Sequence, residues 1–279
     1  GRGDQRLARH LPAEHSLTVL VGGVPAKDVD LDGLEIEESD EVVQRRLVGG
    51  GALHDRRHVG TSYSRRMTLL DISADEVLNT TRAVRKRLDF SRPVEDDVIR
   101  ECVATAMQAP SGSNVMTMQF VVVKDADKRH AIGEIYKQCW AIYREMPFFA
   151  GSIKKDGESE QAQQDRVTDS ATYLSEHMAE APALVLGCTA GRVDGAPAMM
   201  SASSMGNILP GVWSFMLAAR ARGLGTAWTT ISLMMEKEVA DIVGIPFDEI
   251  QQTCLTPLAY TVGTDFKRAM RPDPDTIIH

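Results

Sequence analysis

The chain has 279 residues, of which 43% are hydrophobic and 25% are charged, a balance that allows a substantial buried core. Its formal net charge of −8 disfavours a broad attraction to nucleic acid or anionic membranes, because both need an excess of Lys and Arg. The sequence has no apolar run of about 18 residues, and its first ten residues, "GRGDQRLARH", contain no apolar stretch. We therefore expect a cytoplasmic protein that binds neither nucleic acid nor membrane.

The four cysteines lie far apart in the sequence, and none of them forms a C-x-x-C pair. This spacing disfavours both a disulfide framework and a structural zinc site, so we expect no metal. Free cysteine is among the most often buried residue types. We therefore predict buried, reduced thiols at Cys102, Cys139, Cys188 and Cys254.

The composition changes near Met67, because all thirteen methionines lie at or after this position. Residues 1–66 carry loosely patterned glycines, arginines and acidic stretches. We expect a poorly patterned N-terminal extension over residues 1–66 and one domain over residues 67–279. The extension is either an added segment, the product of an upstream start, or a mobile regulatory arm.

Two helices are expected early in this domain. Ser73 followed by Glu76 predicts a capping box that opens a helix with Val77 and Leu78 inward. We place the basic run Arg82–Arg87 at the end of this helix, where the three-residue spacing sets Arg82 and Arg85 on one side. The run is either a solvated basic face that complements the helix dipole or an anion site. A second helix is predicted to start at Ser91 and Pro93, with one buried face at Val94, Val98, Cys102 and Ala106.

The stretch "APSGSNVMTMQFVVV", which starts at Ala109, places four small or polar residues between a helix and a buried strand. These four offer more hydrogen-bonding groups than a turn requires, so we expect a polar ligand beside them. Further elements are a helix over residues 128–143, a polar, mobile insertion over 146–168, a helix ending near Glu180 and a buried strand from Pro182.

The helix that we expect from Asn207 is apolar nearly all round, so it needs cover on two sides. A partner subunit is a candidate for the second cover. A third strand should follow Gly223, and a fourth should start at Cys254. Because helices and strands alternate without a regular β-α-β rhythm, we predict a mixed sheet with helices packed on it.

Four segments together resemble the FMN-dependent nitroreductase family. They are "TTRAVRKR", "APSGSNVMTMQFVVV", "LAARARGLGTAWTT" and the C-terminal stretch from Ile242, "IVGIPFDEIQQTCLTPLAYTVGTDFKRAMRPDPDTIIH". The resemblance runs from Ser73 to the end of the chain. It implies an α+β, nitroreductase-like fold, with a mixed, mainly antiparallel sheet and helices on both faces. It also implies a domain-intertwined homodimer with FMN at the subunit interface.

The resemblance assigns no catalytic side chain, since FMN carries the redox chemistry. Arg85 is implied as the cation near the N1/O2 edge of the flavin. Thr81 and Ala83 stand where many relatives have Arg and Ser. The residues implied to bind FMN are Arg82, Ala83, Val84, Arg85, Lys86, Lys267 and Arg271 toward the phosphate, Ser111, Gly112, Ser113 and Asn114 from the partner, and Thr229, Thr230 and Ile231 at the ring.

The activity implied by the resemblance is the reduction of nitroaromatic compounds, and of quinones as a close second class, by NADPH or NADH. Electrons would pass in pairs through FMN in a ping-pong cycle to a small aromatic acceptor. An aromatic cluster is either a clamp for such a substrate or core packing; its members are Trp140, Tyr143, Phe148 and Phe149. The alternatives are a flavin enzyme of the same fold that performs reductive dehalogenation or flavin fragmentation, and a flavin-binding protein without turnover.

Overall fold

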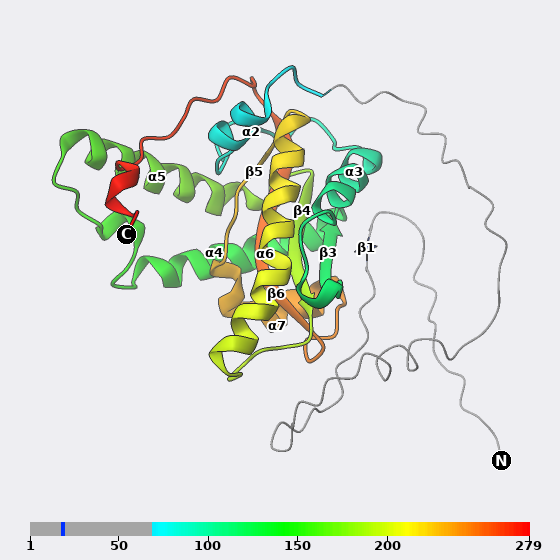
Figure 1. Ribbon diagram of the computed structural model, residues 1–279. Helices are drawn as coiled ribbons and strands as arrows, with labels where there is room; N and C mark the ends of the chain where they lie inside the picture. Colours follow the sequence, from blue (N-terminus) through cyan, green and yellow to red (C-terminus); the bar gives the residue numbers. More distant parts are fainter. Residues whose placement is uncertain (1–17, 20–68) are drawn as a thin grey trace, which may run out of the picture. The chain divides into compact units, whose positions relative to one another are not determined.

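Strands and helices alternate along the computed structural model, which describes Thr18–Val19 and residues 69–279 (Figure 1). The described residues belong to one of the two units into which the chain divides. The expected extension over residues 1–66 lies outside the described residues apart from Thr18–Val19, so its alternatives stay predictions. With η for 3-10 helices, the elements are β1 (Thr18–Val19), α2 (Ala74–Thr80), β2 (Leu88–Asp89), α3 (Asp96–Ala106), η1 (Gly112–Asn114), β3 (Met118–Val123), α4 (Ala126–Arg144), η2 (Ala150–Ser152), α5 (Glu158–His177), η3 (Met178–Glu180), β4 (Ala183–Ala190), α6 (Ala198–Ala221), β5 (Leu224–Thr226), η4 (Ile231–Met235), α7 (Glu236–Val243), β6 (Ile250–Thr261) and η5 (Pro274–Thr276).

The strands form one sheet in the order β1-β3-β4-β6-β2, and β5 also pairs with β6. All of these strand pairs are antiparallel. Isolated parallel bridges join Ala83 to Thr226 and Gly191 to Ile250. The predicted α+β fold with a mixed, mainly antiparallel sheet is confirmed.

Helices cover both faces of this sheet, as predicted. All six residues of β3 are buried, and successive side chains of a strand point to opposite faces. Phe120 stacks on Phe215 of α6 with 5.5 Å between ring centroids. Val121 and Val123 instead belong to a core cluster with residues of α4, α5 and α7. The expected strand from Gln119 is therefore buried between two helical layers.

The long helix α6 (Ala198–Ala221) packs against the sheet (Figure 1) and starts nine residues before the predicted Asn207. Gly187 of β4 permits the close approach, because a Cβ at this position would meet Val212 at 2.5 Å. Ile208, Val212, Phe215 and Ala219 form the buried face, as predicted.

The first predicted helix is right at its start and wrong at its end. Ser73 and Glu76 form the expected capping box. The helix stops at Thr80, however, and Leu78 is 56% exposed instead of inward. Residues 82–87 are therefore not helical, and the placement of Arg82 and Arg85 on one side of a helix is wrong. The physical reason is a non-local bond: the Val84 N–H donates to the Thr226 carbonyl at 2.8 Å, which draws the segment to β5.

The polar insertion expected over residues 146–168 is shorter than predicted, because α5 starts at Glu158. The polar residues from Glu158 onward lie on the surface of this helix. Glu158 and Glu160 are in its first turn, where acidic side chains complement the helix dipole. Gln161 also donates to Asp165 one turn further on. The second predicted helix likewise starts a few residues late, at Asp96, but its buried face is as expected.

The four cysteines are free and buried, which confirms the prediction. Among the described helices, none combines the length and the hydrophobicity needed to cross a membrane. The described residues also include no group of three or more His, Cys, Asp or Glu that would hold a metal ion. The cytoplasmic location stays a prediction.

Candidate functional site

A cavity of about 460 Å³ lies between α4, α5 and the segment that follows β5. Its walls are mainly apolar and aromatic, and Arg85 is the one charged residue among them. The residues that line it are Arg85, Tyr136, Trp140, Tyr143, Met146, Phe148, Ala150, Val167, Ala171, Trp228, Thr229, Thr230, Ile231 and Met234.

Polar groups gather in one part of this wall. Arg85 donates from Nη1 to Ser170 Oγ of α5 at 3.2 Å, and burial lowers the pKa of its guanidinium. Tyr136 is nearly fully buried, and burial raises its pKa to about 12. Thr229 donates its hydroxyl to the Leu255 carbonyl of β6 at 2.6 Å, so the strand fixes its position. A cation and a protonated phenol therefore face an otherwise apolar space.

The aromatic cluster forms one wall, as a close-packed group. Trp140 and Tyr143 lie 5.6 Å apart between centroids, and Phe149 packs edge-on against both. The Tyr143 hydroxyl accepts the Ala150 N–H at 3.0 Å, which fastens the α4–α5 connection to α4. Phe148 lines the cavity and is 65% exposed, whereas Phe149 stands behind the lining. Phe149 therefore serves in packing, whereas Phe148 lies at the cavity, where its role as a substrate clamp stays a prediction.

Trp140 carries a buried hydrogen-bond donor that has no partner in the described part of the chain. It is 7% exposed, and its indole Nε1 is buried with no hydrogen-bond partner. Buried polar groups in proteins are nearly always satisfied, so an unpaired donor in a ring that lines a cavity requires an explanation. Among the described residues, the hydrogen-bond acceptor for this donor is missing.

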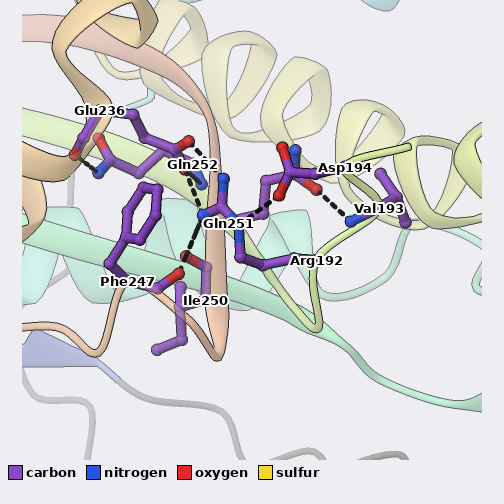
Figure 2. Close-up of polar contacts among 8 residues, drawn as sticks. All are labelled: Arg192, Val193, Asp194, Glu236, Phe247, Ile250, Gln251 and Gln252. Carbon is purple, nitrogen blue, oxygen red and sulfur yellow. Dashed lines mark hydrogen bonds and ion pairs between the residues drawn. The ribbon is translucent and has the colours of Figure 1, made fainter. Parts of the chain in front are cut away.

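The part of the wall that η4 contributes, Ile231 and Met234, is followed along the chain by a network around Arg192 (Figure 2). Arg192 donates from both terminal nitrogens to the carboxylate of Glu236, at 3.1 and 2.8 Å, and also to the Phe247 carbonyl at 2.9 Å. Glu236 accepts the Gln252 N–H at 2.7 Å. Because Glu236 directly follows η4, the network joins the end of this wall to the start of β6.

Beside the cavity, basic residues gather where the resemblance places a phosphate. The Nε of Arg82 is buried without a partner, and burial together with the like charge of Arg271 lowers the pKa of Arg82. Lys86 is paired with Asp169 at 2.5 Å. Arg271 and Lys267 lie on the exposed C-terminal tail, and Arg271 lines a groove of about 360 Å³ against the N-terminal part of α5.

The polar loop Ser111–Asn114 lies outside the cavity of its own chain. Ser113 and Asn114 both have positive φ angles, 53° and 55°, a conformation uncommon for residues other than glycine. The Gly112 N–H donates to Asn207 Oδ1 at 2.5 Å, which ties the loop to the middle of α6. Two adjacent residues in this conformation mark the loop as a candidate site.

The structure therefore brings Arg85, Thr229, Thr230 and Ile231 into one cavity with three of the aromatic residues, and leaves the phosphate-end residues and the loop outside it. Sequence reasoning missed Tyr136, although its spacing to Trp140 and Tyr143 is the helical signal for a shared face. The other lining residues that were missed are Met146, Ala150, Val167, Ala171, Trp228 and Met234.

Residues 78–263, two thirds of the chain, match the model of the nitroreductase family, so the chain belongs to this family. Iodotyrosine deiodinase 1 of Mus musculus is 33% identical over 122 residues. That match covers 41% of this chain and 40% of the deiodinase, so the chain spans less than half of this curated relative.

Solved structures share the fold. A BluB-like flavoprotein from Clostridium difficile 630 has a TM-score of 0.56 and 18% identity, with 75% of this chain and 98% of that chain covered. An iodotyrosine deiodinase bound to FMN and 3-iodo-L-tyrosine has a TM-score of 0.54 and 18% identity, with coverage of 71% and 95%. A mutant of the FMN and NADPH-dependent nitroreductase NfnB from sphigopyxis sp. strain HMH has a TM-score of 0.52 and 20% identity, with coverage of 75% and 98%.

We predict that Glu236→Gln lowers the free energy of unfolding by about 3 kcal/mol, because it leaves Arg192 largely buried beside a neutral partner. The matched control is Asp194→Asn, which removes the other carboxylate of the same arginine. Since Asp194 is 63% exposed and Glu236 only 13%, the control should cost about 1 kcal/mol or less. Urea unfolding measures both variants, and equal losses would contradict this account of the network.

Proposed function

We propose that this protein is an FMN-dependent oxidoreductase that uses NADPH or NADH to reduce nitroaromatic compounds, and quinones as a second class. The observation that carries the proposal is the cavity. In a chain of the nitroreductase family, it joins a cation, Arg85, and the segment Thr229–Ile231 to an aromatic wall. When bound, FMN supplies hydride and electron transfer.

The residues present fit this cofactor. Arg82 offers a guanidinium whose Nε is buried and unpaired, as expected of a group that awaits an anion. Arg271 lies close enough to lower the pKa of Arg82, so the two cations suit a phosphate. Thr229, Thr230 and Ile231 would lie along the ring, and Arg85 at its electron-rich edge. Lys267, Ala83, Val84 and Lys86 stay candidate contacts at the phosphate end.

The cavity favours a flat, apolar acceptor with one oxygen-bearing end. Its aromatic walls exclude water and offer ring faces for stacking. The unpaired N–H of Trp140 suits a nitro or quinone oxygen. The chain itself thus orients the substrate, while Tyr136 keeps its proton.

Reductive dehalogenation is the second candidate, and the match to iodotyrosine deiodinase 1 favours it. An amino-acid substrate brings an ammonium and a carboxylate, and each needs a partner when it leaves water. Arg85 would suit the carboxylate, but the described lining residues carry no acid for the ammonium. This charge balance favours neutral or anionic aromatic acceptors.

The exposed side of α6 supports a homodimer. Met199 is 74% exposed and Trp213 is 38% exposed on this helix, while the opposite face packs on the sheet. The Ser111–Asn114 loop is bonded to Asn207 in the middle of the same helix. A second copy seated on this side would therefore meet the polar loop, consistent with a loop that serves the partner's flavin.

The direct test is the visible spectrum of the purified protein under nitrogen. We expect absorption at about 370 and 450 nm, a property of oxidised flavin, which bleaches on addition of NADPH. The bands should return on addition of a nitroaromatic compound and not of 3-iodotyrosine. Return with 3-iodotyrosine alone would favour the dehalogenase, bands that NADPH and NADH leave unbleached would favour a binding protein, and a chain that takes up no FMN would overturn the proposal.

Trp140→Phe should raise the KM for a nitroaromatic substrate about three- to tenfold with little effect on flavin content, because the ring stays and the N–H donor is lost. Steady-state kinetics measure this effect. The control is Trp228→Phe, the same substitution at another tryptophan of the same cavity. The indole nitrogen of Trp228 is not a buried, unpaired donor, so this variant should change KM less. Equal changes in both variants would argue against a hydrogen bond from Trp140.

Trp213→Glu should convert a dimer into monomers and reduce the bound flavin, because it places a charge on the exposed apolar side of α6. Light scattering gives the mass, and absorbance gives the flavin content. The control is Ile142→Glu, at a position on α4 that is 48% exposed, and it should leave both unchanged. A wild-type chain that scatters as a monomer with full flavin content would refute the dimer.

A further inference from the structure

Arg220 is a buried cation within the segment "LAARARGLGTAWTT", in which the sequence assigned it no role. It lies in the last turn of α6 and is 5% exposed. Its Nη2 donates to Thr80 Oγ1 at 3.2 Å and to the Thr264 carbonyl at 3.0 Å. Its Nε and Nη1 are buried and have no partner.

Two neighbouring arginines, unlike Arg220, have carboxylate partners. Arg222 pairs with Glu101 at 3.1 Å, and Arg87 pairs with Asp265 at 2.7 Å. Arg220 makes no ion pair with the described residues. A buried charge without a counter-ion is strongly unfavourable, so this position is costly unless an anion completes it.

The contacts of Arg220 lead to the basic end of the candidate site. Thr80 lies two residues before Arg82, whose Nε is also buried and unpaired. Thr264 lies three residues before Lys267, and the Arg220 guanidinium lies 5.0 Å from the Phe266 ring centroid between them. Burial lowers the pKa of Arg220. The negative charge of Glu76 raises this pKa, whereas the like charges of Arg87 and Arg82 lower it further. Arg220 therefore bridges the two chain segments expected to hold a phosphate.

We infer that Arg220 is a positioning residue of the phosphate end of the flavin site: it holds the segments of Arg82 and Lys267 together, and the phosphate of FMN balances its charge. The inference rests on the proposed function, namely that the chain binds FMN.

The test compares two flavins that differ in the phosphate alone. Flavin-free protein is titrated with FMN and with riboflavin, and binding is followed by quenching of flavin fluorescence. The variant is Arg220→Met, which keeps an apolar stem beside Phe266 and removes the charge. We expect the FMN affinity to fall at least about tenfold, with riboflavin affinity within about twofold of wild type. Arg222→Met, two residues away, is the matched control and should keep the wild-type preference for FMN.

The outcomes separate this inference from the proposed function. Unchanged FMN affinity, or an equal loss for both flavins, would overturn the role of Arg220 while leaving FMN binding intact. A wild-type chain that binds neither flavin would overturn the proposed function and this role with it. If Arg220→Met does not fold, Arg220→Lys decides: it keeps the charge and should retain the preference for FMN within about threefold. Loss of that preference in a folded Arg220→Lys protein would overturn the inference.

Discussion

Backbone pairing along β6 is the constraint on which the site depends. The twelve residues of this strand pair with β4, β5 and β2. Thr229 and Leu255 exchange both backbone hydrogen bonds, so the cavity-lining segment at Thr229 is fixed to the strand. Through β5, the same strand positions Ala83 and Val84, and with them the adjacent Arg82 and Arg85. One strand thus holds both the cavity wall at Thr229 and the segment that carries the two arginines.

Arg192, which is partly buried, and Arg220, which is buried, differ in how their charges are balanced. Arg192 has a bidentate carboxylate partner and two carbonyl acceptors, so its charge is balanced within the chain. Arg220 has a hydroxyl and a carbonyl, with two nitrogens unpaired. Arg192, whose charge has a carboxylate partner, stabilises the segment of η4 and α7. Arg220, whose charge has no such partner among the described residues, lowers the stability of the fold, and destabilising groups of this kind cluster at functional sites.

Local signals in the sequence were enough for most of the fold. Continuous apolar runs predicted β3, β4 and β6, and the Ser73 cap predicted the start of α2. The errors arose where distant contacts overrode local pattern. Residues 82–87 leave the helix because Val84 bonds to Thr226, and the polarity of residues 158–168 belongs to a helix surface. The family resemblance named Arg85, Thr229, Thr230 and Ile231, which the structure brings into one cavity, and their roles stay predictions. The burial and the partners of Arg220 depend on distant segments, so the sequence alone could not show them.

The charges of the cavity also bear on which chemistry the family fold performs here. In the proposed function FMN would carry out the electron transfer with either class of acceptor, so selection between acceptors would depend on the walls. Arg85 supplies the one positive charge among the lining residues, Tyr136, Thr229 and Thr230 supply hydroxyl groups, and the rest of the lining is mostly rings and alkyl groups. A nitro group or a quinone presents oxygen atoms to such donors and an uncharged ring to such walls. A zwitterion would bury its ammonium against aromatic faces and neutral hydroxyl groups, which compensate less of its hydration than a carboxylate does. The balance of charge in the cavity therefore supports the proposal of neutral or anionic aromatic acceptors over an amino acid.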